Sequence, residues 1–522
     1  MSIYTSMIPS SPHTLRRLPL LMLALAAPLA HAQEVIVAAQ HAEGSASGKD
    51  SATLQAVHVT AVRSEGFKPV TVKAGTFRGA DVMDVPSTIN VVTSKVLEAQ
   101  AAEGLYDAVR NTAGVTRQQN GGDTWDQLVI RGVEVQNRTN YRLNGSMPIM
   151  NFSQVPMENK ARVEVLKGAS ALYYGFTAPS GIVNYVSKRA GLHPITSVGL
   201  RFDTNGTVLA HADVGRRFGN EDQYALRLNV AGLAGCPLYD GDLKYDTTNL
   251  EYKGRNLGFA QKADANIYHT KMDDSKRALG PLGGCRATSP YNHSNVKSTG
   301  ANAGFVTAWQ DHRIKYGVHV RREEVNNLVS RTGEKKTDWG LYGEGIWAFE
   351  PFTITTGLRY DHFSLTTARG KSASKGQLNP SINAIWDISP QWSVHAGVAQ
   401  ASRSPRLQEA MLLNLSRGVA DGVKAERAVN TEIGAQWQSG PFTASGAVFR
   451  QVTHDYLGNN ARNEQDNVGK LINRGYELEA GWRDGPWQAR VAMTHSKPRL
   501  EGSLGGLSST LNYTPTGRQW HT

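Results

Sequence analysis

The stretch of sequence that decides the fold is Phe352-Thr353-Ile354-Thr355-Thr356-Gly357-Leu358-Arg359-Tyr360. Large apolar residues stand at its first, third, seventh and ninth positions, and polar or small residues lie between them. This period of two predicts a β-strand with one apolar and one polar face. The same alternation recurs in residues 392–398, 475–482 and 487–494. It is typical of a soluble sandwich, where the apolar face points to a core, and of a membrane barrel, where that face points to lipid.

The connections between these segments distinguish the two folds. Short and long polar connections alternate from about residue 195 onwards, and the short ones lie near residues 219–222, 255, 310–312, 350–351, 389–390, 440 and 484–485. Outer-membrane barrels have short periplasmic turns and long outer loops, whereas a sandwich has no such requirement. We therefore predict a large antiparallel membrane β-barrel over residues 191–522, with about 16 strands.

The composition excludes several other classes of protein. Of 522 residues, 40% are apolar, and the mean hydropathy of −0.38 is too low for a bundle of membrane-spanning helices. A charged fraction of 19% does not suit a disordered polyelectrolyte, and two cysteines exclude a disulfide-dense scaffold and a zinc ribbon. The net charge of +11 is spread along the chain, which argues against nucleic-acid binding. Contact with anionic lipopolysaccharide and simple surface solubility both fit this charge.

Residues 1–32 have the layout of a secretory signal peptide. Arg16 and Arg17 precede an apolar run over residues 18–29, and Ala30-His31-Ala32 fits the small-x-small cleavage pattern. The alternative is a membrane anchor, but the run is too short to cross a bilayer of ~30 Å as a helix. We expect cleavage after Ala32 and a mature chain that works outside the cytoplasm.

Residues 33–79 form a predicted flexible extension, because its first part is polar and rich in small residues. Within it lies one candidate strand, where valines and a threonine favour an extended backbone. This strand is Leu54-Gln55-Ala56-Val57-His58-Val59-Thr60-Ala61.

Residues 80–190 have mixed α/β character. One helix is predicted to begin at Thr93 or Ser94, either of which can cap it, and a second covers residues 104–110. Asn144-Gly145 is a hairpin turn signal. Strands are predicted over residues 87–92, 127–131, 140–143, 162–166 and 182–186.

Several phrases resemble recurrent motifs of TonB-dependent outer-membrane receptors, most closely those of the ferric-siderophore type. In the α/β region they are Asp84-Val85-Pro86-Ser87-Thr88-Ile89, Ile130-Arg131-Gly132, Tyr141-Arg142-Leu143-Asn144-Gly145, Arg162-Val163-Glu164-Val165-Leu166-Lys167-Gly168, Tyr174-Gly175 and Pro179-Ser180-Gly181-Ile182-Val183-Asn184-Tyr185-Val186-Ser187-Lys188-Arg189. In the barrel region they are Gly357-Leu358-Arg359-Tyr360-Asp361, Asn379-Pro380, Ser402-Arg403-Ser404-Pro405 and Asn473-Arg474-Gly475-Tyr476-Glu477-Leu478-Glu479. Together they cover nearly all of residues 52–520, and their order and spacing are more specific than any single phrase.

The resemblance implies an α/β plug domain over residues 80–190, inside the lumen of the barrel. It also implies that residues 33–79 are a periplasmic extension and that residues 54–61 are the TonB box. Barrels of this family have about 22 strands. A count of about 16 then implies either a truncated product or an unusually small barrel, since an open edge in lipid leaves backbone groups unsatisfied.

The function implied is that of an outer-membrane receptor for TonB-dependent uptake of a ferric siderophore, which is released to the periplasm when the plug is remodelled. Haem, cobalamin or a copper chelate are alternative cargoes, and a non-transporting fragment that only binds ligand or phage is a further alternative. The implied partners are the TonB protein of the inner membrane, the iron-siderophore ligand, and outer-membrane lipid and lipopolysaccharide. A monomer in the bacterial outer membrane is expected. No G-x-S-x-G or H-E-x-x-H motif points to an enzyme, and neither a cofactor nor a protein metal site is expected.

Binding of a chelate needs an outward pocket with aromatic and hydrogen-bonding groups, and arginines can pair with anionic chelates. The alternative is that such side chains are simply solvated loop residues. The plug residues that we consider as ligand contacts are Arg117, Gln119, Asn120, Trp125, Arg138 and Phe152.

The two cysteines, Cys236 and Cys285, fall in two outer loops if strand parity is counted from the plug. Both would face an oxidising space, so a disulfide is expected, which would stabilise the loops by about 2–4 kcal/mol. The alternative is a copper site with His269 and Met272, because thiolate and thioether ligands favour Cu(I).

Overall fold

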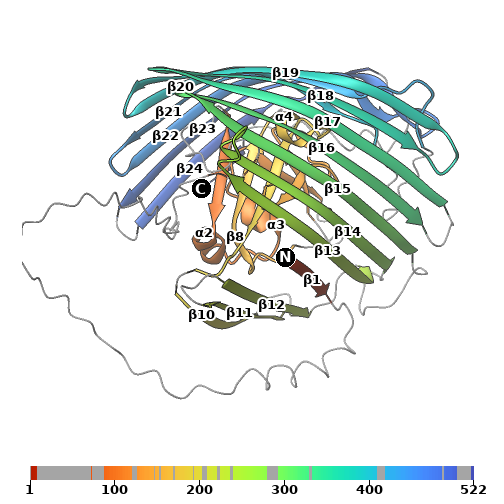
Figure 1. Ribbon diagram of the computed structural model, residues 1–522, viewed down its shortest axis with the longest axis horizontal. Helices are drawn as coiled ribbons and strands as arrows, with labels where there is room; N and C mark the ends of the chain where they lie inside the picture. The colour runs from red at the N-terminus through yellow and green to blue at the C-terminus, as the bar shows by residue number, and fades with distance from the viewer. Residues whose placement is uncertain are drawn as a thin grey trace, which may run out of the picture. The chain divides into compact units, whose positions relative to one another are not determined.

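The structure is a computed structural model (Figure 1). It describes residues 2–8, 72, 74, 87–119, 126–145, 147–151, 155–168, 171–191, 193–202, 208–219, 224–234, 239–278, 292–327, 332–407, 418–484, 487–502 and 519–521. Several predictions lie outside these residues: the cleavage site after Ala32, the box at residues 54–61, both cysteines, and the ligand contacts Asn120, Trp125 and Phe152.

Long antiparallel strands form most of the chain. Each strand from β13 to β23 pairs with the next strand in sequence, and in Figure 1 the strands β13 to β24 run side by side as green to blue arrows. Their bounds are β13 (Tyr239–Arg255), β14 (Lys262–Ala278), β15 (Asn292–Trp309), β16 (His312–Asn327), β17 (Thr332–Phe349), β18 (Phe352–Thr366), β19 (Ser372–Ser389), β20 (Trp392–Arg403), β21 (Glu426–Ser439), β22 (Phe442–Asn459), β23 (Gln465–Asp484) and β24 (Trp487–Ser496).

Shorter strands complete this part of the molecule. β1 (Ser2–Ile8) and β26 (Gln519–His521) pair with β13 and β24, and β25 (Arg499–Gly502) pairs with β23. A separate three-stranded sheet contains β10 (Ile195–Phe202), β11 (Val208–Phe218) and β12 (Tyr224–Ala234). Within the described residues, the large sheet has 15 strands, β1, β13 to β24, β25 and β26, which is close to the predicted number of about 16.

The two faces of these strands carry opposite kinds of side chain. On β18, Leu358 is 52% exposed, whereas the next residue, Arg359, is fully buried. Exposed leucines, isoleucines and valines recur on β19 to β24, and buried carboxylates and amides lie on the inner face. A soluble sandwich requires the reverse, so that alternative is wrong and the apolar face is the lipid-facing one.

The connections also follow the predicted alternation. Five pairs of neighbouring strands are joined by only two residues each, namely β15 and β16, β17 and β18, β19 and β20, β21 and β22, and β23 and β24, whereas the other links between the strands from β13 to β24 are longer. The short turns mark the periplasmic end of a barrel of this kind and the longer loops mark its outer end. Of the residues that the structure describes, none lies in a helix that is both long and apolar enough to cross a membrane.

The plug is built on a mixed five-stranded sheet in the order β2-β8-β9-β6-β7, in which only β6 and β9 run parallel. A second, three-stranded sheet of the plug, β3-β4-β5, is formed by residues that lie between β2 and β6 in the chain. The bounds are β2 (Ile89–Thr93), β3 (Val115–Gln119), β4 (Gln127–Ile130), β5 (Val133–Glu134), β6 (Tyr141–Leu143), β7 (Met147–Pro148), β8 (Lys160–Lys167) and β9 (Gly181–Ser187).

Three short helices belong to the plug: α2 (Ser94–Ala99), α3 (Leu105–Val109) and α4 (Ala171–Tyr174). The first two confirm the predicted helices, although Thr93 makes no side-chain capping bond. Asn144 and Gly145 both have positive φ angles, as the predicted hairpin turn requires.

The plug core joins α2 and α3 to the apolar face of the sheet, where Val163, Val165 and Tyr185 are fully buried. Tyr268, an inward residue of β14, packs in the same cluster. Other plug residues contact inward residues of β18, β21 and β23. Because inner faces from widely separated strands all meet it, the plug lies in the lumen.

Candidate functional site

A group of four charged residues joins the plug to the barrel wall. We call Arg131, Lys167, Glu432 and Glu477 the clamp. Arg131 Nε and Nη2 donate to the two carboxylate oxygens of Glu477 at 3.1 and 3.0 Å, and its Nη1 lies 2.5 Å from Glu432 Oε2. Lys167 Nζ lies 2.9 Å from Glu477 Oε2. All four side chains are buried, so each charge depends on its partners rather than on water.

The turn between β4 and β5 presents Arg131 to the wall. Its backbone is left-handed, with φ of 51°, and Gly132 follows with φ of 77°. The carbonyl of Arg131 accepts a hydrogen bond from Ser496 Oγ at 2.7 Å and another from Asn473 Nδ2. The Arg131 guanidinium also stacks on the Phe449 ring, 4.3 Å from its centroid. Strands β21 to β24 therefore all hold this one residue.

The pKa values of the clamp cations follow from this environment. Burial alone would lower the pKa of Arg131, but the carboxylates of Glu432 and Glu477 outweigh it and hold that pKa above its usual range. Burial also dominates at Lys167, where it lowers the pKa although Glu477 opposes the shift. Arg131 is thus the permanently charged member of the clamp.

Close approach at the clamp requires glycine at position 114. Gly114 has a φ of 69°, and a Cβ there would lie 2.3 Å from Glu477 Oε1. The first described segment of the plug also reaches the clamp, because Thr88 Oγ1 donates to Glu432 Oε1 at 2.7 Å. A pull on the chain before Thr88 would therefore act directly on a clamp carboxylate.

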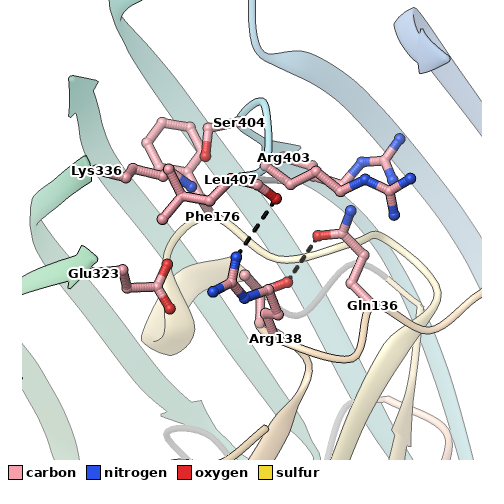
Figure 2. Close-up of a pocket in the computed structure, with 10 residues that line it drawn as sticks. Gln136, Arg138, Phe176, Glu323, Lys336, Arg403, Ser404 and Leu407 are labelled. Atoms are coloured by element: carbon pink, nitrogen blue, oxygen red, sulfur yellow. Dashed lines mark hydrogen bonds between the residues drawn. The ribbon is translucent and has the colours of Figure 1, made fainter. Parts of the chain in front are cut away.

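A second site lies where plug loops meet the outer ends of the barrel strands. We call it the outward pocket (Figure 2). The cavity itself is small, about 10 Å³, and the rest of the hollow includes open solvent. The residues that line it are Gln136, Arg138, Thr139, Phe176, Glu323, Lys336, Arg403, Ser404, Arg406 and Leu407.

The barrel strands place these residues at the outer side of the plug. Arg403 is the last residue of β20, Lys336 lies near the start of β17, and Glu323 lies near the end of β16. These strand ends adjoin the longer loops, which face the outside of the cell. Beneath the pocket, Phe176 packs edge-on against Phe363 with ring centroids 5.6 Å apart, which gives the pocket an apolar base.

Arg138 is the charged plug residue among those that line the outward pocket. Figure 2 shows it between Glu323 on one side and Gln136 and Arg403 on the other. It is 4% exposed, and its Nη1 donates to the carbonyl of Leu407 at 3.5 Å. Its Nε and Nη2 atoms are buried and have no hydrogen-bond partner among the described residues.

Two other cations of the pocket, Arg403 and Lys336, have carboxylate partners. Arg403 Nη2 lies 2.5 Å from Glu426 Oε2, although its Nε atom has no partner within the described part of the chain. Lys336 Nζ lies 3.4 Å from Asp338 Oδ2. Ser404 Oγ is a further buried group without a described partner.

The predicted ligand contacts that the structure describes lie in different places. Arg138 lies in the outward pocket. Arg117 does not line it, and instead its Nη1 lies 3.4 Å from Asp126 Oδ1. Burial raises the pKa of Asp126 even though the Tyr106 N–H and Arg117 oppose the shift. Gln119 is the last residue of β3, and its side chain is not described.

Neither the barrel side of the pocket nor the clamp was predicted as a site. Two motifs in the sequence contain residues of these sites. Ser402-Arg403-Ser404-Pro405 includes Arg403 of the pocket, and Ile130-Arg131-Gly132 includes Arg131 of the clamp. No local pattern indicated Glu323 or Lys336, which enter the pocket only through the register of β16 and β17.

The copper alternative gains no support from the described residues. His269 and Met272 lie three positions apart on β14 and so point to opposite faces. Met272 is 1% exposed and packs in the apolar cluster beneath the outward pocket, whereas His269 is exposed and contacts Thr299. No cluster of three or more potential metal-ligating side chains occurs in the part of the chain that the structure describes.

Comparison with known proteins assigns the family. Residues 184–520 match the family described as TonB dependent receptor-like, beta-barrel, which is more than half of the chain. Residues 81–182 match the TonB-dependent Receptor Plug Domain. The chain belongs to the TonB-dependent receptor family. TonB-dependent receptors are transport receptors of the bacterial outer membrane, and the outward apolar face of β13 to β24 fits that location.

Individual TonB-dependent receptors resemble the chain to different extents. The ferrichrome receptor FcuA of Yersinia enterocolitica is 32% identical over 207 residues, which are 37% of this chain and 27% of FcuA. The iron-regulated outer membrane virulence protein of Vibrio cholerae is 20% identical over 69% of this chain and 64% of its own length. The chain thus spans less than two thirds of these curated relatives.

A solved TonB-dependent receptor matches more of the chain. The FrpB iron transporter of Neisseria meningitidis (F3-3 variant) superposes with a TM-score of 0.70 and 26% sequence identity, and the match covers 84% of each chain. The shared part includes both a plug and a barrel wall, since it extends over most of both proteins.

Proposed function

We propose that this chain is an outer-membrane receptor that binds a ferric siderophore outside the cell and releases it to the periplasm by TonB-driven remodelling of the plug. The observation that carries the proposal is the outward pocket. It lies where plug and wall meet at the outer end of the barrel, and buried donors of Arg138, Arg403 and Ser404 point to a ligand there. The role requires binding and movement and no bond-making step.

Release requires part of the plug to leave the wall. The contacts of Thr88 and the clamp with the wall are hydrogen bonds and ion pairs, which water can replace when the plug moves. β2 is an edge strand of the plug sheet and has only five paired residues, from Ile89 to Thr93. Elements with few contacts open first under load, so β2 is the expected point of failure.

The proposed partner for this load is TonB. A partner that adds a strand to residues 54–61 would gain main-chain hydrogen bonds for the pull. The force would then pass along the chain to Thr88 and through it to Glu432. Outer-membrane lipid surrounds the apolar face of the strands, and a monomer is sufficient for this function.

The experiment is uptake of iron-55 chelates by iron-starved cells that lack the gene, compared with cells that carry it. Uptake of at least one ferric siderophore should require the gene, should require TonB, and should fail with Val57→Pro in the box. Normal uptake of every chelate by the deletion strain would refute the proposal. Gene-dependent uptake of haem, cobalamin or a copper chelate instead would reassign the cargo.

A further inference from the structure

We infer that the outward pocket selects ferric chelates that carry negative charge and present two acceptor oxygens side by side to Arg138. This inference rests on the proposed function and names the class of substrate. Carboxylate-bearing and catecholate chelates belong to this class. A neutral ferric trihydroxamate does not, because its three singly charged groups cancel the charge of the ferric ion.

The unpartnered atoms of Arg138 identify the shape of the acceptor. Nε and Nη2 carry the two N–H groups that lie along one edge of a guanidinium, and this edge matches two neighbouring oxygens of a planar anion. Arg131 in the same plug shows this edge with a carboxylate bound to it, because its Nε and Nη2 atoms donate to the two oxygens of Glu477 at 3.1 and 3.0 Å. At Arg138 the same edge is buried and has no partner in the described residues.

Charge in the pocket favours an anion. Arg138 forms no ion pair with any described residue, whereas Lys336 and Arg403 are compensated by Asp338 and Glu426. Glu323 lies beside Arg138 and is the one carboxylate among the described residues that line the pocket, whereas the lining includes four cations, Arg138, Lys336, Arg403 and Arg406. Excess buried positive charge is costly unless a ligand supplies negative charge.

Further donors lie around the same space. Arg403 Nε and Ser404 Oγ are buried without described partners, so two other groups can donate to the same ligand. The main chain of Arg406 is fixed by Gln465, which accepts from its N–H at 3.0 Å and donates to its carbonyl at 2.7 Å. The outer rim of the pocket is therefore positioned before a chelate arrives, which limits the entropy lost on binding.

The test measures chelate affinity of the purified full-length receptor in detergent. The probes are ferric citrate, a ferric tris-catecholate and a neutral ferric trihydroxamate. Wild-type receptor should bind at least one anionic probe about tenfold or more tightly than the neutral one. Arg138→Gln should weaken the anionic probe by about tenfold or more and leave the neutral probe unchanged, and Arg138→Lys should fall between them.

The control is Arg110→Gln, which removes the same charge from an exposed position of the plug. It should leave all three affinities unchanged. Without ligand, the unfolding temperature of Arg138→Gln should be no lower than that of the wild type, since the variant removes part of the excess buried positive charge. A lower unfolding temperature with loss of every probe would mark Arg138 as structural and overturn the inference.

The inference and the proposed function can fail separately. Gene-dependent uptake of the neutral trihydroxamate alone, with no effect of Arg138→Gln, would overturn the charge selection and leave the receptor function in place. Absence of gene-dependent uptake of any iron chelate would remove both. The wild-type comparison of charged and neutral probes decides the question even if the variants do not fold.

Discussion

Arg131 is the plug residue whose guanidinium pairs with two buried carboxylates of the wall, Glu432 and Glu477. Replacing Arg131 by Gln leaves the buried Glu477 with Lys167 as its cation and the buried Glu432 with only Thr88 and His395 as partners in the described part of the chain. We expect the free energy of plug unfolding to fall by about 3–5 kcal/mol. Urea-dependent pulse proteolysis of the folded receptor measures this change.

Two further variants separate the effect of the charge at Arg131 from the effect of its buried contacts. Arg131→Lys keeps the charge but loses the two-atom contact with Glu477, so it should lie between wild type and Arg131→Gln. Arg110→Gln, at an exposed position, should change the free energy by less than about 0.5 kcal/mol. Wild-type stability of Arg131→Gln would show that the clamp does not hold the plug.

Lys160 should give the plug a pH-dependent stability. Burial lowers its pKa from 10.5 to about 7, although Glu158 opposes the shift, and its Nζ donates to the carbonyl of Pro156 at 3.0 Å. The unfolded chain therefore keeps the Lys160 proton up to about pH 10.5, whereas the folded chain releases it near pH 7. Stability should rise as the pH increases from about 7 to about 10.5.

The variant Lys160→Met isolates this contribution. It should be more stable than wild type at pH 7, and the difference should shrink as the pH rises, because only the wild type has a proton to lose at this position. Thermal unfolding of both proteins between pH 7 and pH 10 measures the difference. A constant difference across this range would contradict the prediction.

At the scale of elements, β2 should have to leave β8 during transport. Asn90 lies opposite Val165 in this pair of strands, so cysteines at both positions are close enough for a disulfide. In a background where Cys236 and Cys285 are serines, Asn90→Cys with Val165→Cys should block iron uptake and spare chelate binding. A reductant should restore uptake.

The matched control moves one cysteine to the neighbouring strand. Val165 also lies opposite Val183 of β9, and a disulfide there locks a part of the sheet that need not open. Val165→Cys with Val183→Cys should therefore transport normally. If both disulfides blocked iron uptake equally, or if neither did, β2 would not be the element that leaves the sheet during transport.

Elements were predictable from the sequence where a period could be read over many residues. The long strands were predicted because alternation shows both the strand and its two faces, as Leu358 and Arg359 illustrate. α4, β3, β5 and β7 were not predicted, because two to five residues carry no clear period. Tertiary contacts, rather than local propensity, determine such short elements.

The site was predictable only in part, for a related reason. Arg138 was a candidate because it is an arginine in an outward plug loop, but its neighbours in the pocket come from distant barrel strands. Arg131 stood in a quoted phrase, yet its partners Glu432 and Glu477 lie 301 and 346 positions away. A single sequence shows which residues can pair and does not show which strands the register brings together.

At the scale of the whole molecule, the apolar outer face should behave as a surface in lipid. Leu358 is 52% exposed in the middle of β18, and Leu358→Arg should destabilise the folded receptor in lipid vesicles by about 2–4 kcal/mol. In a water-facing site the same change would be nearly neutral. Denaturant titration of the vesicle-inserted receptor, followed by tryptophan fluorescence, measures the effect.

Thr366→Arg is the control for depth. Thr366 is exposed on the same strand but is its last residue at the outer end, where the expected cost is only about 0–1 kcal/mol. Equal effects of the two arginines would contradict a lipid-facing surface with a defined midplane.

The contact of Arg131 with β21 and β23 also has a consequence for assembly of the barrel. These two strands flank β22, so one guanidinium bridges three adjacent ribbons. A slip of β23 by a single residue would turn Glu477 to the outside and leave Arg131 with half of its partners. Binding of the plug would therefore favour the correct register of β23, because a wall with the wrong register would not present Glu477 to Arg131.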